Sequence, residues 1–269
     1  MKDLKFLNWR SHRIHVADSG EGEPLLLVSG LGCDADMWAP FMQEFAGRRI
    51  IRFDAPGTGR SSSPLLPVSI ADLADLTATV LDTCDVTSAD VIGFSYGGTI
   101  AQQFAFDHPD RVRRLVLAAT TCGLGSLPGS MQAMAVLANT LRFYSPTYFD
   151  QMVPSLFGGV TGRNSNANPN DMIKLTTSAP SSYAYAMQVL GAAGWTSLPF
   201  LDQIRHETLV INGDDDPLVS VANAQMLAQR IPRAQLEIVA QAGHLFLWDD
   251  AVNLAPRISR FVNAPSRTN

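Results

Sequence analysis

A single serine lies among glycines in the stretch GFSYGG, residues 93–98. The glycine two positions before Ser95, and the two that follow Tyr96, indicate a backbone bend too sharp for side chains at those positions. The preceding ADVIGF is typical of a buried parallel strand, and the following residues have helical spacing up to Pro109. A strand, a tight turn and a helix form the context in which a serine hydroxyl is presented as a nucleophile, with helix N–H groups facing the anion that forms.

A serine hydroxyl needs a base to take its proton, and the sequence contains five histidines. His244 follows the last predicted strand, at the sheet edge where Ser95 is expected, and Gly243 lets its loop turn inward. We therefore predict His244 as the base. The other four occupy opening strands, a helix end or the start of a strand, and are interpreted as structural: His12, His15, His108 and His206.

The histidine needs an acid to fix its tautomer, and INGDDDP offers candidates directly after a strand that ends at the same edge. The order serine, aspartate, histidine along the chain matches one fold family. Only one carboxylate is required, so two of the three are expected to belong to a solvated turn. The candidates left open for the acid are Asp214, Asp215 and Asp216. Another aspartate, Asp54 in FDAPGTG, is interpreted as a turn residue.

The elements that must position these residues alternate between strand and helix, which predicts an α/β fold. A capping box of Ser69 and Asp72 predicts the start of one helix. Helices are also expected at 37–45, after Ser95 and at 221–231. Strands are predicted at 3–9, 12–20, 24–30, 48–54, 89–94, 111–120, 207–213 and 234–240.

The stretch 121–202 breaks this alternation, since it is helical in tendency and rich in Leu, Met, Phe, Tyr and Ala. It leaves after one strand and returns before the next, so we expect it to fold over the carboxyl edge of the sheet as a cap. The predicted organisation is therefore a core of residues 1–120 and 203–269 with a helical cap of residues 121–202. A polar loop is expected at 162–171.

Composition narrows the class of partner. The 269 residues are 46% hydrophobic with a net charge of −5 and no Lys/Arg cluster, which argues against nucleic acid or an anionic membrane. No signal peptide or run of about 18 apolar residues is evident, so we expect a cytoplasmic protein without an integral membrane segment. The three cysteines are expected to be free thiols: Cys33, Cys84 and Cys122. Neither a metal nor an organic cofactor is predicted.

Four motifs, GFSYGG, FDAPGTGRS, NGDDDPLVS and AGHLFLW, together resemble the α/β-hydrolase superfamily. The resemblance implies a mostly parallel eight-stranded sheet flanked by helices, with a helical cap inserted after strand six. The acid is the last residue of that family's G-x-x-D pattern, which selects Asp216. By the same analogy the backbone N–H groups of Leu31 and Tyr96 form the oxyanion hole, although Ser29 stands where the family has histidine. The nucleophilic serine argues against dehalogenase and epoxide hydrolase activity.

Longer runs, among them AQQFAFDHPDRVRRLVLAAT, GWTSLPFLDQI and RIPRAQLEIVAQAGHLFL, resemble intracellular depolymerases of medium-chain-length poly(3-hydroxyalkanoates). This resemblance implies ester hydrolysis on a chain of 3-hydroxy acids with apolar side chains. The expected partner is a small-molecule, oligomeric or polymeric ester with apolar acyl groups. A polymer-granule surface or a second copy of the chain is an expected partner of an apolar cap. Trp195 and Met187 are candidates for lining an acyl pocket, against a packing role within the cap.

Three other functions stay open at this point. The first is a small-molecule esterase, lactonase or thioesterase, which chain-length preference on soluble substrates would identify. The second is a carbon–carbon bond hydrolase, which would act on vinylogous diketones. The third is a ligand-binding, receptor-like protein that keeps the three site residues but turns over negligibly.

Overall fold

The computed structural model describes residues 5–163, 179–249 and 254–264. It contains an eight-stranded sheet in the order β1-β2-β4-β3-β5-β6-β7-β8. β1 and β2 pair antiparallel, β2 is antiparallel to β4, and all other neighbours are parallel. The strands are β1 (Lys5–Trp9), β2 (His12–Ser19), β3 (Pro24–Val28), β4 (Arg49–Phe53), β5 (Ala89–Phe94), β6 (Val112–Ala118), β7 (Glu207–Gly213) and β8 (Ala234–Val239). The mostly parallel eight-stranded sheet predicted from the sequence is confirmed.

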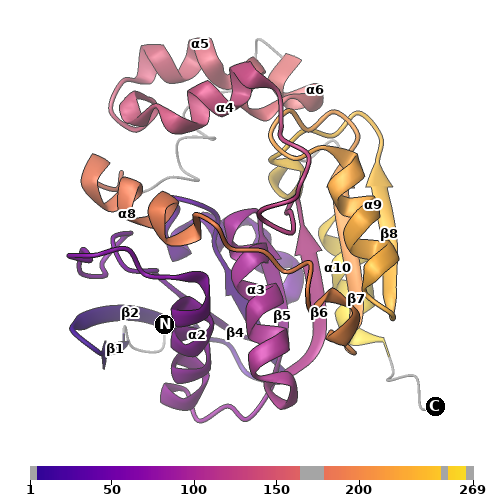
Figure 1. Cartoon of the computed structure of the whole chain (residues 1–269). Coiled ribbons are helices and arrows are strands. Elements are labelled where there is room, and N and C mark those ends of the chain that lie inside the picture. Colours follow the sequence, from indigo (N-terminus) through magenta and orange to yellow (C-terminus); the bar gives the residue numbers. More distant parts are fainter. Residues whose placement is uncertain (1–4, 164–178, 250–253, 265–269) are drawn as a thin grey trace.

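Helices cover both faces of the sheet, so alternate strand residues enter two separate cores. Leu26 and Val28 pack in the core beneath α2, α3 and α9, whereas Leu25 and Leu27 pack against the short helices near Trp38 and against α10. Figure 1 shows α2, α3 and α9 in front of the sheet. The helices named here are α2 (Ile70–Thr83), α3 (Tyr96–Asp107), α9 (Val221–Arg230) and α10 (Ala255–Asn263).

Local signals in the sequence explain two helix starts. Ser69 and Asp72 form the predicted capping box at the start of α2. The helix expected at 37–45 is instead three short pieces, with Pro40 in the first turn of the middle one, where a missing N–H is tolerated. These pieces are η1 (Ala35–Trp38), α1 (Ala39–Met42) and η2 (Gln43–Phe45).

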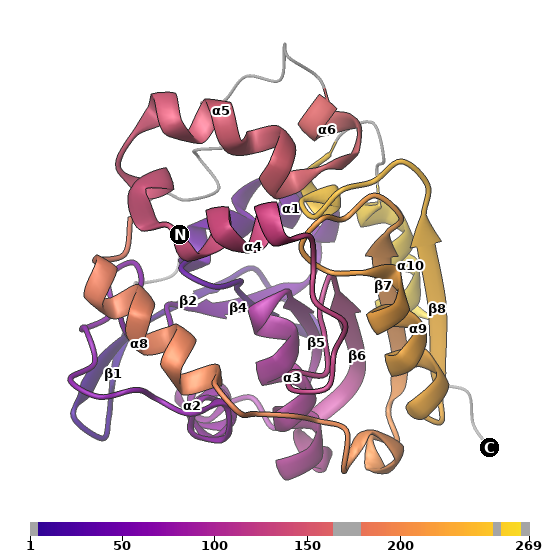
Figure 2. The ribbon, with the colours of Figure 1, turned by 45° about the horizontal axis from the view of Figure 1, so that its top comes forward.

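The helices in the described residues between β6 and β7 lie over the carboxyl ends of the parallel strands (Figure 1 and Figure 2). We call α4 (Met131–Ala138), η4 (Thr140–Phe143), α5 (Pro146–Phe157), α6 (Gly159–Arg163) and α8 (Ser182–Ala192) the inserted helices. The last residues of the central strands stand in register, with Phe94 beside Ala118 and Ala118 beside Ile211. The loops that follow these strands therefore meet beneath the inserted helices.

Two sequence expectations concern this segment. The exact boundaries at 121 and 202 remain a prediction, and the polar loop expected at 162–171 falls mostly outside the described residues.

None of the helices in the described ranges combines the length and apolar character needed to cross a membrane.

Candidate active site

Ser95 occupies the turn between β5 and α3 in a strained conformation, with φ 53° and ψ −117°. Two hydrogen bonds fix it: its N–H donates to the Ala118 carbonyl at 2.8 Å, and its own carbonyl accepts from the Thr120 hydroxyl at 2.7 Å. The neighbouring glycines are required by close approach. A Cβ on Gly97 would lie 2.1 Å from the Val28 carbonyl oxygen, which explains the glycine content of the stretch.

The three predicted residues from separate loops form one hydrogen-bonded chain. His244 Nε2 lies 3.1 Å from Ser95 Oγ, and His244 Nδ1 lies 2.8 Å from Asp216 Oδ2. The Asp216 side chain is fully buried, and its Oδ1 accepts from the N–H groups of Leu218 and Val219 at 2.8 and 2.9 Å. Since a carboxylate only accepts, Nδ1 donates to it, and Nε2 is left to accept from the serine hydroxyl.

The two neighbouring aspartates have no contact with the histidine. Asp214 is exposed, while Asp215 forms an ion pair with Arg163 and accepts from the Gly159 N–H at 3.0 Å. The geometry therefore separates Asp216 from the other two candidates that the sequence left open.

The loop after β3 lies against the serine. A Cβ placed on Gly30 would be 3.7 Å from the Ser95 Cβ, and Leu31 borders the same space as Ser95. Across the described residues, neither backbone nor side-chain oxygens accept the Leu31 N–H. The Tyr96 N–H belongs to the first turn of α3, where N–H groups lack an intrahelical acceptor. Both predicted donors thus lack a protein acceptor among the described residues, and their role as an oxyanion hole stays a prediction.

Ser29, where the resembled family has histidine, braces this loop. Its hydroxyl donates to the Asp34 carbonyl at 3.2 Å and accepts from Trp38 Nε1 at 3.1 Å. The serine therefore connects the start of the loop to η1.

Gln188 was not singled out from the sequence, yet it joins an inserted helix to the same loop. This side chain on α8 is 6% exposed, and its Oε1 accepts from the Gly32 N–H at 2.9 Å. Its Nε2 donates to the Pro56 carbonyl at 3.3 Å. Gly32 directly follows Leu31 and has φ 73°, a left-handed conformation that glycine adopts readily, so the amide holds the turn of the loop next to Leu31.

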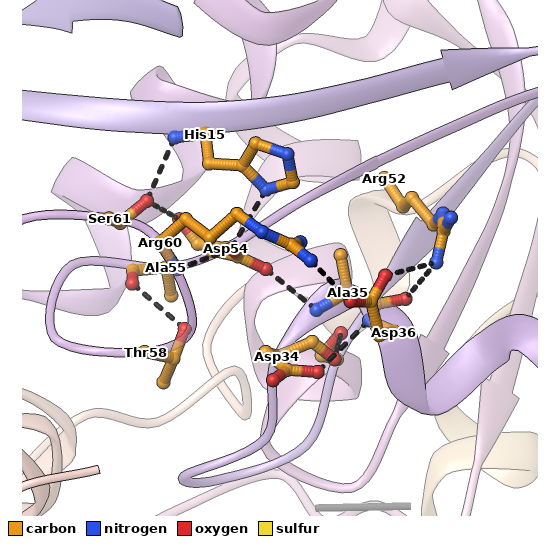
Figure 3. A network of polar contacts seen from close by, with 11 residues as sticks. His15, Asp34, Ala35, Asp36, Arg52, Asp54, Ala55, Thr58, Arg60 and Ser61 are labelled. Carbon is orange, nitrogen blue, oxygen red and sulfur yellow. Dashed lines mark hydrogen bonds and ion pairs between the residues drawn. The ribbon is translucent and has the colours of Figure 1, made fainter. Parts of the chain in front are cut away.

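A buried network supports the other end of this loop (Figure 3). Asp54 Oδ2 accepts from His15 Nδ1 and from the Arg60 N–H, each at 2.8 Å, and its Oδ1 accepts from the Ala35 N–H at 2.7 Å. Burial alone would raise the Asp54 pKa, but these hydrogen bonds outweigh it and lower that pKa below its ordinary value. Asp54 lies just before the turn that the Thr58 N–H closes on the Ala55 carbonyl, and its carboxylate joins three segments, which the sequence analysis missed.

The inserted helices also hold the loop that carries His244. The Phe157 carbonyl accepts from the His244 N–H at 2.6 Å, and the Val160 N–H donates to the Gln241 carbonyl at 2.9 Å. A Cβ on Gly243 would lie 1.9 Å from the Phe157 oxygen, so the two backbones touch. Gly243 therefore permits close packing, while the left-handed backbone of this loop lies at Gln241, with φ 59°.

Two hollows meet at Ser95 and share Leu31 and Leu137. The first, the closed compartment, includes His244, and none of its described lining residues is exposed. The second, the open cleft, reaches the surface between α4 and α8, where Met134 is 43% and Val189 is 45% exposed. Further residues of the closed compartment are Cys33, Met37, Arg142, Phe149, Leu156 and Leu218, and those of the open cleft are Tyr96, Thr99, Thr121, Tyr185 and Trp195.

The remaining predicted residues have distinct places. Trp195 lines the open cleft, and Met187 lines a separate small hollow beside Pro56 and Tyr96. All three cysteines are free. Burial, with the nearby Asp34 carboxylate, raises the pKa of the Cys33 thiol to about 12, so this thiol is not a second nucleophile in the closed compartment at neutral pH. In the described parts of the chain no group of three or more His, Cys, Asp or Glu side chains is arranged to hold a metal.

Comparison with known proteins adds a family to this geometry. A family model described as "Alpha/beta hydrolase family" matches residues 25–257. A poly(3-hydroxyalkanoate) depolymerase of Ectopseudomonas oleovorans is 39% identical over 240 residues, covering 89% of this chain and 84% of that protein. A 2-hydroxymuconate semialdehyde hydrolase of Pseudomonas sp. strain CF600 is 30% identical over 262 residues, covering 93% and 90%. Among solved structures, a hydrolase from Pseudomonas aeruginosa PA01 superimposes with a TM-score of 0.83 over 98% of this chain and 99% of that one, at 24% identity.

Proposed function

Because this chain belongs to the alpha/beta hydrolase family, we propose that it is a serine esterase acting on chains of 3-hydroxy acids with apolar side chains. The observation that carries the proposal is the continuous hydrogen-bonded chain from Ser95 through His244 to the buried Asp216. That arrangement is suited to activating a serine hydroxyl.

The proposed reaction has two halves. Ser95 Oγ attacks the ester carbonyl carbon while His244 Nε2 takes its proton, and Asp216 stabilises the resulting imidazolium. The N–H groups of Leu31 and Tyr96 bind the oxyanion, and each such donor typically contributes about 10²- to 10³-fold to the rate. His244 then protonates the leaving alkoxide. A water activated by His244 hydrolyses the acyl-enzyme and restores the serine hydroxyl.

Two further observations support an apolar ester as the substrate. Phenylalanine, leucine and methionine side chains dominate the closed compartment, and alanine, valine and aromatic side chains line much of the open cleft together with threonines. The depolymerase relative is named for a polyester of this kind. We propose that the inserted helices act as a cap that selects these substrates. Exposed apolar side chains of α4 and α8 lie at the cleft mouth. They suit contact with a water-insoluble polymer or with a second copy of the chain.

A carbon–carbon bond hydrolase is the second candidate, favoured by the 30% identity to a semialdehyde hydrolase that covers most of both chains. The same three residues suit that chemistry, so the substrate, rather than the residues, decides between them. A receptor-like protein with negligible turnover fits less well, since the strained Ser95 and the buried acid form a complete site.

Release of 3-hydroxy acids from an emulsified medium-chain polyester tests the proposal. Wild type is compared with Ser95→Ala, and a soluble octanoate ester is assayed alongside. Polymer hydrolysis that disappears in Ser95→Ala supports both nucleophile and substrate class. Turnover of the octanoate ester alone makes the protein a small-molecule esterase, turnover of a vinylogous diketone alone makes it a carbon–carbon hydrolase, and activity surviving in Ser95→Ala refutes the mechanism.

A further inference from the structure

The two hollows that meet at Ser95 differ in one respect that bears on substrate orientation. His244 lines the closed compartment and does not line the open cleft. In the proposed reaction His244 Nε2 must protonate the leaving oxygen, so that oxygen faces His244. The alcohol part of the ester is therefore placed in the closed compartment, and the acyl part extends into the open cleft beside Tyr96.

The closed compartment also limits the size of what it holds. Every described residue of its lining is at least partly buried, whereas the open cleft reaches the surface at Met134 and Val189. Among the described residues, the open cleft is therefore the hollow through which a long chain reaches solvent. The alcohol part must then be short, which for a polyester of 3-hydroxy acids means the end of the chain that bears the free carboxylate.

The closed compartment contains a cation suited to that carboxylate. Arg142 is 8% exposed, and its Nη1 donates to the carbonyl oxygens of Val136, Leu137 and Asn139 at the end of α4. Its Nη2 donates to the Tyr185 hydroxyl at 2.9 Å. The guanidinium also packs on the rings of Phe143 and Tyr185, and among the described residues no carboxylate forms an ion pair with Arg142. A buried guanidinium without a carboxylate partner favours an anionic ligand.

We propose that Arg142 binds the terminal carboxylate of the leaving 3-hydroxy acid, so that the protein shortens its substrate from the carboxyl end. The inference rests on the proposed esterase function. In the acylation step the bond from Ser95 Oγ to the carbonyl carbon forms and the bond from that carbon to the alcohol oxygen breaks. The serine proton passes through His244 to the released hydroxyl group, and the shortened chain remains on Ser95 until water releases it.

Arg142 also stabilises the carboxyl end of α4 through its contacts with carbonyl groups, so its removal affects folding as well. The test must therefore separate carboxylate binding from a general loss of structure. Two dimers of 3-hydroxyoctanoate make this separation: one has a free carboxylate, and the other has a neutral carboxamide that the esterase chemistry leaves intact. Hydrolysis of the internal ester is followed by chromatography of the released 3-hydroxyoctanoate.

Four proteins are compared: wild type, Arg142→Met, Arg142→Lys and Arg163→Met. Arg163 is the matched control, because it is an arginine of the inserted helices that lies outside both hollows. Wild type is expected to show kcat/KM about 10- to 100-fold higher for the acid dimer than for the amide dimer. This is the ratio expected when a hydrogen bond to a charged group is made with one substrate and is missing with the other. Arg142→Met loses this preference, so that its kcat/KM on the acid dimer falls to the value that the same variant shows on the amide dimer. Arg142→Lys keeps most of the preference, and Arg163→Met keeps all of it.

Several outcomes contradict the inference. An equal loss on both dimers in Arg142→Met assigns Arg142 to folding alone, and a preference that survives in Arg142→Met assigns the carboxylate to another group. If wild type hydrolyses both dimers at the same rate, the esterase function stands and the inference is wrong. If wild type hydrolyses neither dimer nor a soluble octanoate ester, the proposed function fails and this inference fails with it.

Discussion

Replacing Gln188 by methionine tests whether an inserted helix holds the loop that carries Leu31. Methionine has a similar length and volume but cannot replace the amide as a strong hydrogen-bonding group. The Gly32 N–H loses an acceptor at 2.9 Å and the Pro56 carbonyl loses a donor at 3.3 Å, both at a buried position. Each unsatisfied buried group costs about 1–3 kcal/mol, so we expect the free energy of unfolding to fall by about 1–3 kcal/mol after partial relaxation.

The effect on catalysis follows from the position of Gly32 next to Leu31. Complete loss of one oxyanion donor costs about 10²- to 10³-fold in kcat. The substitution moves the Leu31 N–H without removing it, so we expect kcat on a soluble octanoate ester to fall about tenfold. KM should change by less than about threefold, because every residue that lines the two hollows keeps its side chain and the expected shift is confined to the backbone at Leu31.

Gln103→Met is the matched control. Gln103 is 8% exposed, accepts from Trp195 Nε1 at 2.7 Å and donates to Asp107 at 2.8 Å. It joins α3 to Trp195 of the open cleft but contacts none of the loops that carry Leu31, Asp216 and His244. Gln103→Met should therefore lower stability with kcat within about twofold of wild type. Steady-state kinetics and thermal unfolding of both variants decide the matter. Unchanged kcat in Gln188→Met, or an equal fall in the two variants, would refute the reasoning.

Three further predictions concern the serine, the acid and the buried network. Ser95→Gly should be inactive yet raise the free energy of unfolding by about 1 kcal/mol, because glycine relieves the strain at φ 53°; chemical denaturation that shows Ser95→Gly no more stable than Ser95→Ala counts against this. Asp216→Asn should lower kcat about 10³- to 10⁴-fold with near-native stability, because the amide favours the wrong histidine tautomer, and a fall below tenfold contradicts the assignment. The Asp54 pKa is lower in the folded protein than its ordinary value of 3.8 in the unfolded chain, so the ionised carboxylate stabilises the fold. This contribution is fully present above pH 3.8 and is lost as the pH falls through the folded-state pKa. The free energy of unfolding, measured by urea titration at pH values from about 7 to about 3, should therefore fall less steeply with acidification in Asp54→Asn than in wild type. An equally steep fall in both proteins would argue against this role of Asp54.

Much of the fold was predictable because its signals are local. All six residues of β5 are buried, as its apolar run indicated, and the capping box of Ser69 and Asp72 lies within a single turn. Parallel strands place their carboxyl ends at one edge, so the loops holding Ser95, Asp216 and His244 had to meet. Choosing Asp216 over its neighbours needed either the family pattern or the geometry.

The residues that sequence reasoning missed depend on contacts between distant parts of the chain. Gln188 meets Gly32 across 156 positions, and neither residue carries a local pattern that predicts the other. His15 and Asp54 pair across 39 positions, inside segments that read as an ordinary strand and an ordinary turn. Arg142 resembles any cation near a helix end, and only its burial beside Ser95 in the closed compartment sets it apart.

The backbone contact between residues 157–160 and residues 241–244 limits how this chain can be recombined with its relatives. The Phe157 carbonyl is the acceptor for the His244 N–H, and a Cβ on Gly159 would lie 2.2 Å from the Gly243 nitrogen. A chimera that exchanges the whole segment between β6 and β7 would replace this partner of the histidine loop with a foreign backbone. Crossover points placed on either side of residues 157–160 would let substrate preference be transplanted while the original histidine support stays in place.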